Sequence, residues 1–79
     1  MGQRPRPRPQ HLAAKLLAIR QQLGVSQQKM AKLINAQCAR ISEYERGERE
    51  PNLLLLLNYA RLAKVTVDSL IDDNLDLPL

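Results

Sequence analysis

Apolar side chains recur at helical spacing through most of the chain, and the first such stretch covers residues 10–23. The positions on one face of this stretch are Leu12, Leu16, Ile19 and Leu23. Basic and polar residues, among them Lys15, occupy other positions, so the pattern predicts an amphipathic helix. Gly24 ends it, because glycine enters the left-handed conformation of a helix C-cap without strain.

Two short helices separated by a tight turn are predicted next. Ser26 is a good N-cap for a helix that begins at Gln27. Its apolar face consists of Met30, Ala31 and Ile34. Asn35 tolerates the left-handed conformation of a turn, and a third helix follows over residues 37–46 and stops at Gly47. The inward-facing residues of this part are Ala36, Ile41 and Tyr44.

The second half of the chain predicts two further helices. Pro51 or Asn52 opens the fourth, which runs to Ala63, and Thr66 caps a short fifth helix over residues 67–71. The core stripe expected on the fourth helix is Leu53, Leu56, Leu57, Ala60 and Ala63. The fold class is therefore all-α, a compact bundle of five helices in one domain.

The two ends of the chain differ from this pattern. Within residues 1–9, arginine and proline alternate from Arg4 to Pro9, which excludes a helix and predicts a flexible, extended basic arm. Residues 74–79 form a short tail with leucine at every second position. We expect an arm at 1–9, a helical domain at 10–73 and a tail at 74–79.

Charge is distributed unevenly along the chain, whose net charge is +4. Residues 1–40 contain eight basic residues and no acidic one, whereas residues 41–79 contain four basic and eight acidic residues. This asymmetry predicts a positive face of the kind that binds phosphate groups. A basic tail on an ordinary surface explains the composition equally well.

The composition argues against an enzyme, a metal site and a bound cofactor. His11 and Cys38 are the only residues of their types, so neither a disulfide within the chain nor a Cys/His zinc site can be assembled. The longest apolar run, residues 53–57, is far too short to cross a bilayer. A single cysteine fits a reducing cytosol, and we expect a cytoplasmic protein without catalytic activity.

The segment most informative about function begins at Ser26 and reads S-Q-Q-K-M-A-K-L-I-N-A-Q-C-A-R-I-S-E-Y-E-R-G-E-R-E-P. Two short helices joined by a turn of about four residues allow the second to stand out and enter a DNA major groove. The segment resembles the lambda-repressor-like, XRE-type helix-turn-helix domain, and the resemblance extends over residues 12–71. Its strongest matches are Ser26-Gln27, Ala31, Ile41, Glu45-Arg46-Gly47, Pro51 and the closing V-T-V-D-S-L.

The resemblance implies a role for each matching position. Gln27 would touch a DNA phosphate and brace the third helix, and Arg46 would approach the DNA backbone. The residues expected to face the major groove are Gln37, Cys38, Ala39 and Arg40, with Glu43 at its edge. Arg20 and Glu45 match a partly buried salt bridge that ties the first helix to the third.

Several of these roles have alternatives that the sequence leaves open. Arg40 can bond to guanine through two N–H groups, or contact a phosphate, or remain solvated. Gln37 can read adenine or cap the helix, while Cys38 and Ala39 can touch a thymine methyl or simply permit close approach. Glu43, with Glu48 and Glu50, can reject wrong sites or weaken binding overall.

The arginines of the arm are a second candidate contact with DNA. Arg4, Arg6 and Arg8 could follow phosphates or enter a narrow minor groove, or they could belong to a solubilising tail.

Five consecutive leucines, residues 53–57, cannot all face one core, so Leu54 or Leu55 should be exposed. With Leu75 and Leu77 they predict an apolar patch that joins two copies on a palindromic operator. Alternatively, the extra leucines pack against the tail within one chain.

The sequence thus favours a sequence-specific DNA-binding transcription regulator, a repressor that binds double-stranded DNA as a homodimer. The alternative is a protein-interaction module on the same fold, such as an antitoxin or an adaptor with secondary DNA binding.

Overall fold

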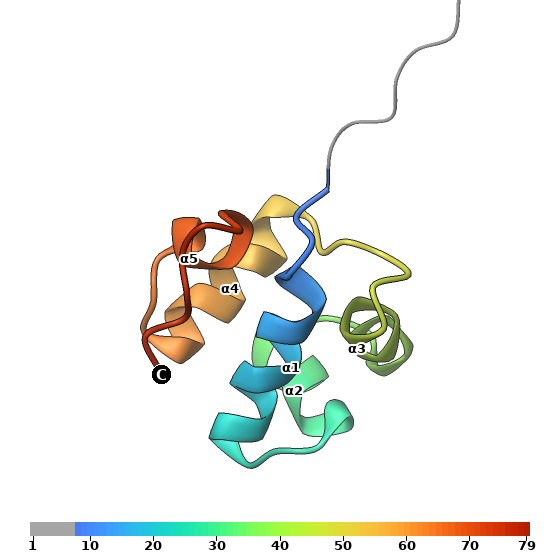
Figure 1. The fold of residues 1–79 in the computed structure, drawn as a ribbon. Helices are drawn as coiled ribbons and strands as arrows, with labels where there is room; N and C mark the ends of the chain where they lie inside the picture. Colours follow the sequence, from blue (N-terminus) through green and yellow to red (C-terminus); the bar gives the residue numbers. More distant parts are fainter. Residues whose placement is uncertain (1–7) are drawn as a thin grey trace, which may run out of the picture.

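The computed structural model describes residues 8–79, and this part of the chain contains five helices and no strand. The helices are α1 (Leu12–Leu23), α2 (Gln27–Ile34), α3 (Cys38–Glu45), α4 (Leu53–Ala63) and α5 (Val67–Ile71) (Figure 1). The expected all-α class and five-helix architecture are confirmed. Helix α1 starts two residues later than its apolar pattern predicts, and α3 is one residue shorter at each end.

Three helices begin with the side-chain caps that their sequences supply. The side chains of Ser26, Asn52 and Thr66 each accept a hydrogen bond from the backbone N–H three residues later. Such a bond satisfies one of the amide groups that a helix start leaves without a partner. Gln37 precedes α3 in extended conformation and makes no such side-chain bond, so the capping alternative for this residue is not realised.

The helix ends are set by residues in the left-handed region. Gly24 has φ 69° and Asn35 has φ 64°, and the backbone N–H of each returns to carbonyls of its own helix. Lys64 ends α4 with φ 59°, a conformation that a lysine adopts less readily than glycine or asparagine.

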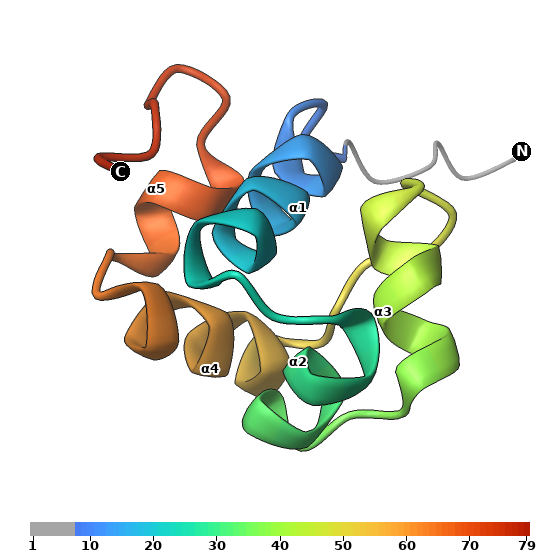
Figure 2. The ribbon, with the colours of Figure 1, turned by 90° about the horizontal axis from the view of Figure 1, so that it is seen from below.

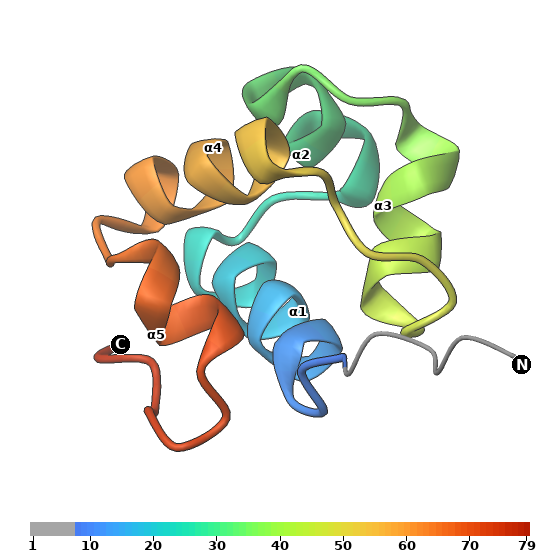
Figure 3. The same cartoon turned by 90° about the horizontal axis from the view of Figure 1, so that it is seen from above.

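Helix α1 lies in the centre of the bundle, between α5 on one side and α3 on the other (Figures 2 and 3). Helix α4 also packs against α1, whereas α2 packs mainly against α3 and, to a lesser extent, against α4. The largest fully buried side chains are Leu16, Ile19, Met30, Ile34, Ile41, Tyr59 and Leu70, contributed by all five helices. Burying each of the aliphatic side chains stabilises the fold by roughly 1.5–3 kcal/mol.

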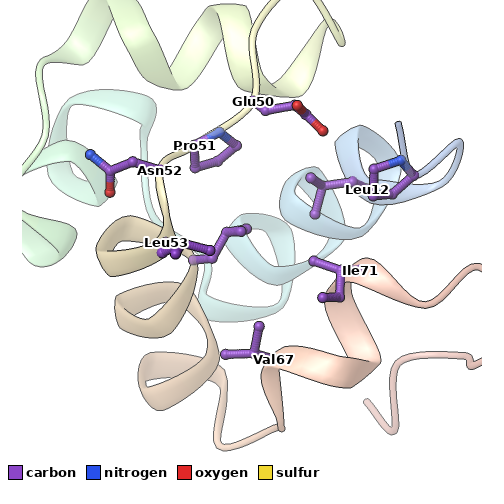
Figure 4. A pocket seen from close by; sticks show the side chains of 9 residues that line it. Leu12, Glu50, Pro51, Asn52, Leu53, Val67 and Ile71 are labelled. Carbon is purple, nitrogen blue, oxygen red and sulfur yellow. The ribbon is translucent and has the colours of Figure 1, made fainter. Parts of the chain in front are cut away.

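The predicted core stripe of α4 needs a correction. Its buried residues are Leu56, Tyr59 and Ala60, whereas Leu53 is 81% exposed and Leu57 is half-buried. Leu53 is the first residue of α4 and stands where the helix begins, at the edge of a cavity of about 490 Å³ between α1, α4 and α5 (Figure 4). Helical spacing places it on the core side, but the neighbouring helices do not cover it. Leu23, at the last position of α1, is exposed for a similar reason.

The structure buries Lys15, which the helical pattern places among the polar positions. Only 8% of Lys15 is exposed, and its Nζ donates hydrogen bonds to the carbonyl oxygens of Ser69 (2.8 Å), Asp72 (3.0 Å) and Leu75 (2.7 Å). All three ammonium protons are therefore used to hold the end of α5 and the tail against α1. Leu77 also packs against the core, so the tail is part of the folded unit.

A second contact between the ends of the domain is made by Asp73. Its carboxylate accepts hydrogen bonds from the backbone N–H groups of Gln10 (2.9 Å) and His11 (3.0 Å), directly before α1. A carboxylate at a helix N-terminus is also favoured by the helix dipole. The cap of α1 thus comes from the other end of the chain.

Replacing Asp73 with asparagine should lower the melting temperature (Tm) at pH 7. The N–H groups of Gln10 and His11 lower the pKa of Asp73 below its ordinary value. Its contribution to stability is therefore present above its unfolded pKa of about 3.9 and is lost as the pH falls through the lowered folded pKa. The Tm difference between wild type and Asp73→Asn should stay constant from about pH 7 to 5 and vanish on further acidification, as followed by circular dichroism. Asp76→Asn on the same exposed tail is the matched control; an equal effect there would contradict the capping role.

Candidate nucleic-acid interface

The start of α3 projects from the bundle. Its inward residues Ile41 and Tyr44 are buried, and Ala31 of α2 is only 3% exposed beneath it. The turn closes on the left-handed Asn35, and the N–H of Ala36 bonds to the carbonyl of Ala31 at 2.8 Å. A small residue at the crossing lets α2 and α3 approach closely. Figure 3 shows α3 at the edge of the molecule, with one flank against α1 and α2 and the other open.

The residues predicted to face the major groove lie on this open flank. Gln37, Cys38 and Ala39 are exposed, and Arg40 is partly exposed. Glu43 lies one turn further along, and Arg46 follows the last residue of α3. We call residues 37–40, 43 and 46 the α3 face.

Glu45 connects α3 to both preceding helices. Its Oε2 accepts from Arg20 Nε at 2.7 Å, and its Oε1 accepts from Arg20 Nη2 at 3.1 Å and from Gln27 Nε2 at 3.0 Å. Arg20 Nη1 also donates to the carbonyl of Val25 at 3.0 Å. The Glu45 side chain is 5% exposed, and its hydrogen bond raises the pKa of Arg20. This group of contacts fixes the angle at which α3 leaves the bundle.

The arginines of the α3 face are paired with glutamates. Arg40 Nη1 donates to Glu43 Oε1 at 2.7 Å, and Arg49 Nε donates to Glu43 Oε2 at 3.4 Å. Arg46 donates two bonds to Glu48, at 2.7 and 3.0 Å, and a third to the hydroxyl of Ser42. These contacts lower the pKa of Glu43, chiefly through Arg40, and that of Glu48 through Arg46.

Sequence reasoning placed Glu43 and Glu48 near the groove but missed these pairs. It also missed Arg49, which reaches Glu43 across six positions of the chain and so gives no helical-spacing signal. The i,i+3 spacing of Arg40 and Glu43 on a predicted helix is the one signal that could have suggested a contact.

Residues 26–50 carry little net positive charge. They contain five basic residues (Lys29, Lys32, Arg40, Arg46 and Arg49) and four glutamates. Arg8, at the start of the described chain, is 61% exposed in its side chain and lies 3.8 Å from Glu50. The predicted contacts of Arg4 and Arg6 lie outside the described residues.

The leucines predicted for a dimer interface do not gather in one patch. Leu54 is 71% exposed and Leu55 half-buried, and both line a hollow beside Ile34 and Asn58. The hollow lined by Leu75 and Leu77 lies over α1 and shares no residue with the first.

Two further findings concern residues 8–79. None of their helices is long and apolar enough to cross a membrane. Within the same range, no cluster of three or more histidine, cysteine, aspartate or glutamate residues is arranged to hold a metal ion.

Several solved structures share this arrangement of helices. The P22 c2 repressor in complex with a synthetic operator is 27% identical over 78% of this chain and 94% of its own, with a TM-score of 0.73. The DNA-binding domain of the same repressor in solution is 27% identical over 89% of this chain and 92% of its own, with a TM-score of 0.74. The restriction-modification controller protein C.AhdI from Aeromonas hydrophila is 25% identical over 76% of this chain and 91% of its own, with a TM-score of 0.68.

A family model identifies the chain from its sequence, although individual curated sequences do not. No curated protein sequence is similar enough to match. The model of a helix-turn-helix family matches residues 16–70, which include α2, α3 and the turn between them. The chain therefore belongs to the lambda-repressor-like helix-turn-helix family.

Proposed function

We propose that this protein is a sequence-specific DNA-binding transcription regulator, a repressor that reads the major groove with α3. The observation that carries the proposal is the exposed leading end of α3, held outward by the contacts of Glu45 with Arg20 and Gln27. The P22 c2 repressor, which has the same fold, was solved on operator DNA. Binding would occlude a promoter without any chemical step, in the cytoplasm.

The α3 face would make the base contacts. Gln37, Cys38, Ala39 and Arg40 would approach base edges, and Glu43 would lie at the edge of the groove. Gln27 and Arg46 would contact phosphates, although each is also engaged by a glutamate of this chain. An arginine that bonds guanine through two N–H groups contributes roughly 1–3 kcal/mol of discrimination.

The basic arm would supply much of the electrostatic attraction. Arg4, Arg6 and Arg8 account for three charges of a net +4, and residues 26–50 are nearly neutral. Contacts of these arginines with phosphates or with a narrow minor groove would release counterions and make binding sensitive to salt.

Two copies would bind together on a palindromic site. Leu54, the most exposed of the four predicted interface leucines, and Leu55 lie together at the start of α4, and the proposed interface is centred on them. Leu75 and Leu77, which line a separate hollow over α1, would lie outside this interface. Two-fold symmetry places recognition helices about one DNA turn apart, so half-sites should be spaced by about 10 base pairs.

Selection of bound duplexes from a random DNA pool tests the base contacts and the symmetry together. We expect the wild type to enrich a palindrome and Arg40→Ala to relax one base position in each half-site, with roughly 1–3 kcal/mol of discrimination lost there. Lys29→Ala and Lys32→Ala, both on the exposed side of α2, should weaken all sequences alike. Equal weakening of every sequence by Arg40→Ala would reduce Arg40 to a phosphate contact. A selected site without two-fold symmetry would contradict the dimer.

A second candidate function is a protein-interaction module, such as an antitoxin or adaptor. The exposed Leu53, which lines the cavity in Figure 4, favours it, as does the exposed Leu54 next to it in the chain. A wild type that enriches no DNA sequence in the same selection, and binds all duplexes weakly, would favour this candidate over the first.

A further inference from the structure

The carboxylate of Glu43 joins two arginines that come from different segments. Arg40 lies on α3, and Arg49 lies in the loop after it; each donates to a different oxygen of Glu43. The Glu43 side chain is 24% exposed, whereas those of Arg40 and Arg49 are 40% and 50% exposed. The side chain of Glu43 is therefore the least exposed of the three.

This contact restricts how Arg40 can present its donors. An arginine has five N–H donors in a rigid fork, and an unrestrained one loses side-chain entropy when it is fixed. Only Nη1 of Arg40 donates to Glu43, so the edge formed by Nε and Nη2 remains available for two bonds to guanine. The pair with Glu43 thus orders Arg40 before any DNA is bound.

The same contact opposes binding to unrelated DNA. A phosphate that approaches Arg40 or Arg49 is repelled by the negative charge of Glu43, even where it uses N–H groups that Glu43 leaves free, whereas an uncharged base is not repelled in this way. Base reading by the free edge of Arg40 leaves the pair intact. The arrangement therefore penalises contacts with the DNA backbone more than it penalises contacts with a base.

We propose that Glu43 determines the sequence selectivity of the α3 face, by positioning Arg40 for one base and by restraining Arg40 and Arg49 from phosphates. This inference rests on the proposed DNA-binding function. In this role Glu43 acts by positioning the two arginines. It does not contact a cytosine at the groove edge with its own carboxylate.

Glu43→Gln tests the inference in two measurements on the whole chain: selection from a random duplex pool, and affinity for one fixed unrelated duplex at several salt concentrations. We expect Glu43→Gln to relax the same base position that Arg40→Ala relaxes. Each arginine released to a phosphate should steepen the slope of log affinity against log salt by about 0.9 and tighten binding about fivefold at 0.15 M salt. The Tm should change little, because Glu43 lies at the surface.

Two further variants distinguish the effect of the position of the Glu43 carboxylate from the effect of its negative charge. Glu43→Asp keeps the charge but withdraws the carboxylate by one methylene, so it should relax the Arg40 position without tightening binding to the unrelated duplex. Glu48→Gln makes the same chemical change at the partner of Arg46. It should tighten binding to the unrelated duplex and leave the base preferences of the wild type unchanged.

The outcomes that overturn the inference are distinct from those that overturn the proposed function. A Glu43→Gln protein with the base preferences of the wild type overturns the inference alone. So does relaxation at a different base from the Arg40 position, which would indicate direct reading by Glu43, or unrelated-duplex affinity that does not rise. A wild type that enriches no sequence overturns the proposed function, and the inference with it.

Discussion

Replacing Lys15 with methionine is expected to destabilise the domain by about 3 kcal/mol, because it removes the donor of three hydrogen bonds from a buried site. Each bond from a charged donor contributes roughly 1.5–3 kcal/mol, and part of this is regained when water reaches the freed carbonyls. Methionine fills a similar volume, so the decrease in the free energy of unfolding is due to the lost hydrogen bonds and not to a cavity. For a chain of this size the Tm should fall by roughly 15 °C, measured by circular dichroism or calorimetry.

The carbonyls that Lys15 binds belong to Ser69, Asp72 and Leu75, so the variant should also release the tail. Limited proteolysis should cut after α5 faster than in the wild type. Lys29→Met is the matched control: Lys29 is exposed on α2, and its substitution should change stability by less than about 0.5 kcal/mol. A Tm of Lys15→Met within about 3 °C of the wild type would show that the three bonds contribute no net stability.

Breaking the Arg20–Glu45 pair should have the second largest effect. Arg20→Met leaves the Glu45 carboxylate, 5% exposed, with only the amide of Gln27 as a donor. Removing one partner of a buried ion pair costs about 3–5 kcal/mol, and the partial exposure of Arg20 reduces the expected loss to about 2 kcal/mol. The corresponding fall in Tm is roughly 10 °C.

A double-mutant cycle with Glu45→Gln measures the pair itself. We expect the two substitutions together to cost less than the sum of the single ones, by about 1–2 kcal/mol, because the second removes the charge that the first leaves unpaired. Arg61→Met, at an exposed position of α4, controls for the loss of a surface arginine. Additive effects would mean that Arg20 acts only through its bond to the carbonyl of Val25.

Local chemistry explains why most of the fold was predictable. Ser26, Asn52 and Thr66 cap their helices with their own side chains, and Gly24 and Asn35 end theirs by adopting the left-handed conformation. Each of these signals acts within about four residues. The periodicity of α1, α2 and α3 is likewise local, so the helix-turn-helix and its outward flank follow from short stretches of sequence.

Long-range contacts explain what was not predictable. The pattern around Lys15 is that of a solvated lysine, and only the carbonyls more than fifty residues away make its burial favourable. Leu53 has the spacing of a core residue, but no neighbouring helix covers it where α4 begins. In the α3 face the residue types were identified, yet the pairing of Arg49 with Glu43 depends on the path of the loop between them.

The cap that Asp73 provides for α1 also affects the order of folding. During synthesis at about 5–20 residues per second, Gln10 and His11 leave the ribosome several seconds before the carboxylate that binds them. Until then the first helix has neither its N-terminal acceptor nor the carbonyls that bind Lys15. A loop of some sixty residues must close before these contacts can form. The nascent helix should therefore form and unfold repeatedly until residues 69–75 have been synthesised.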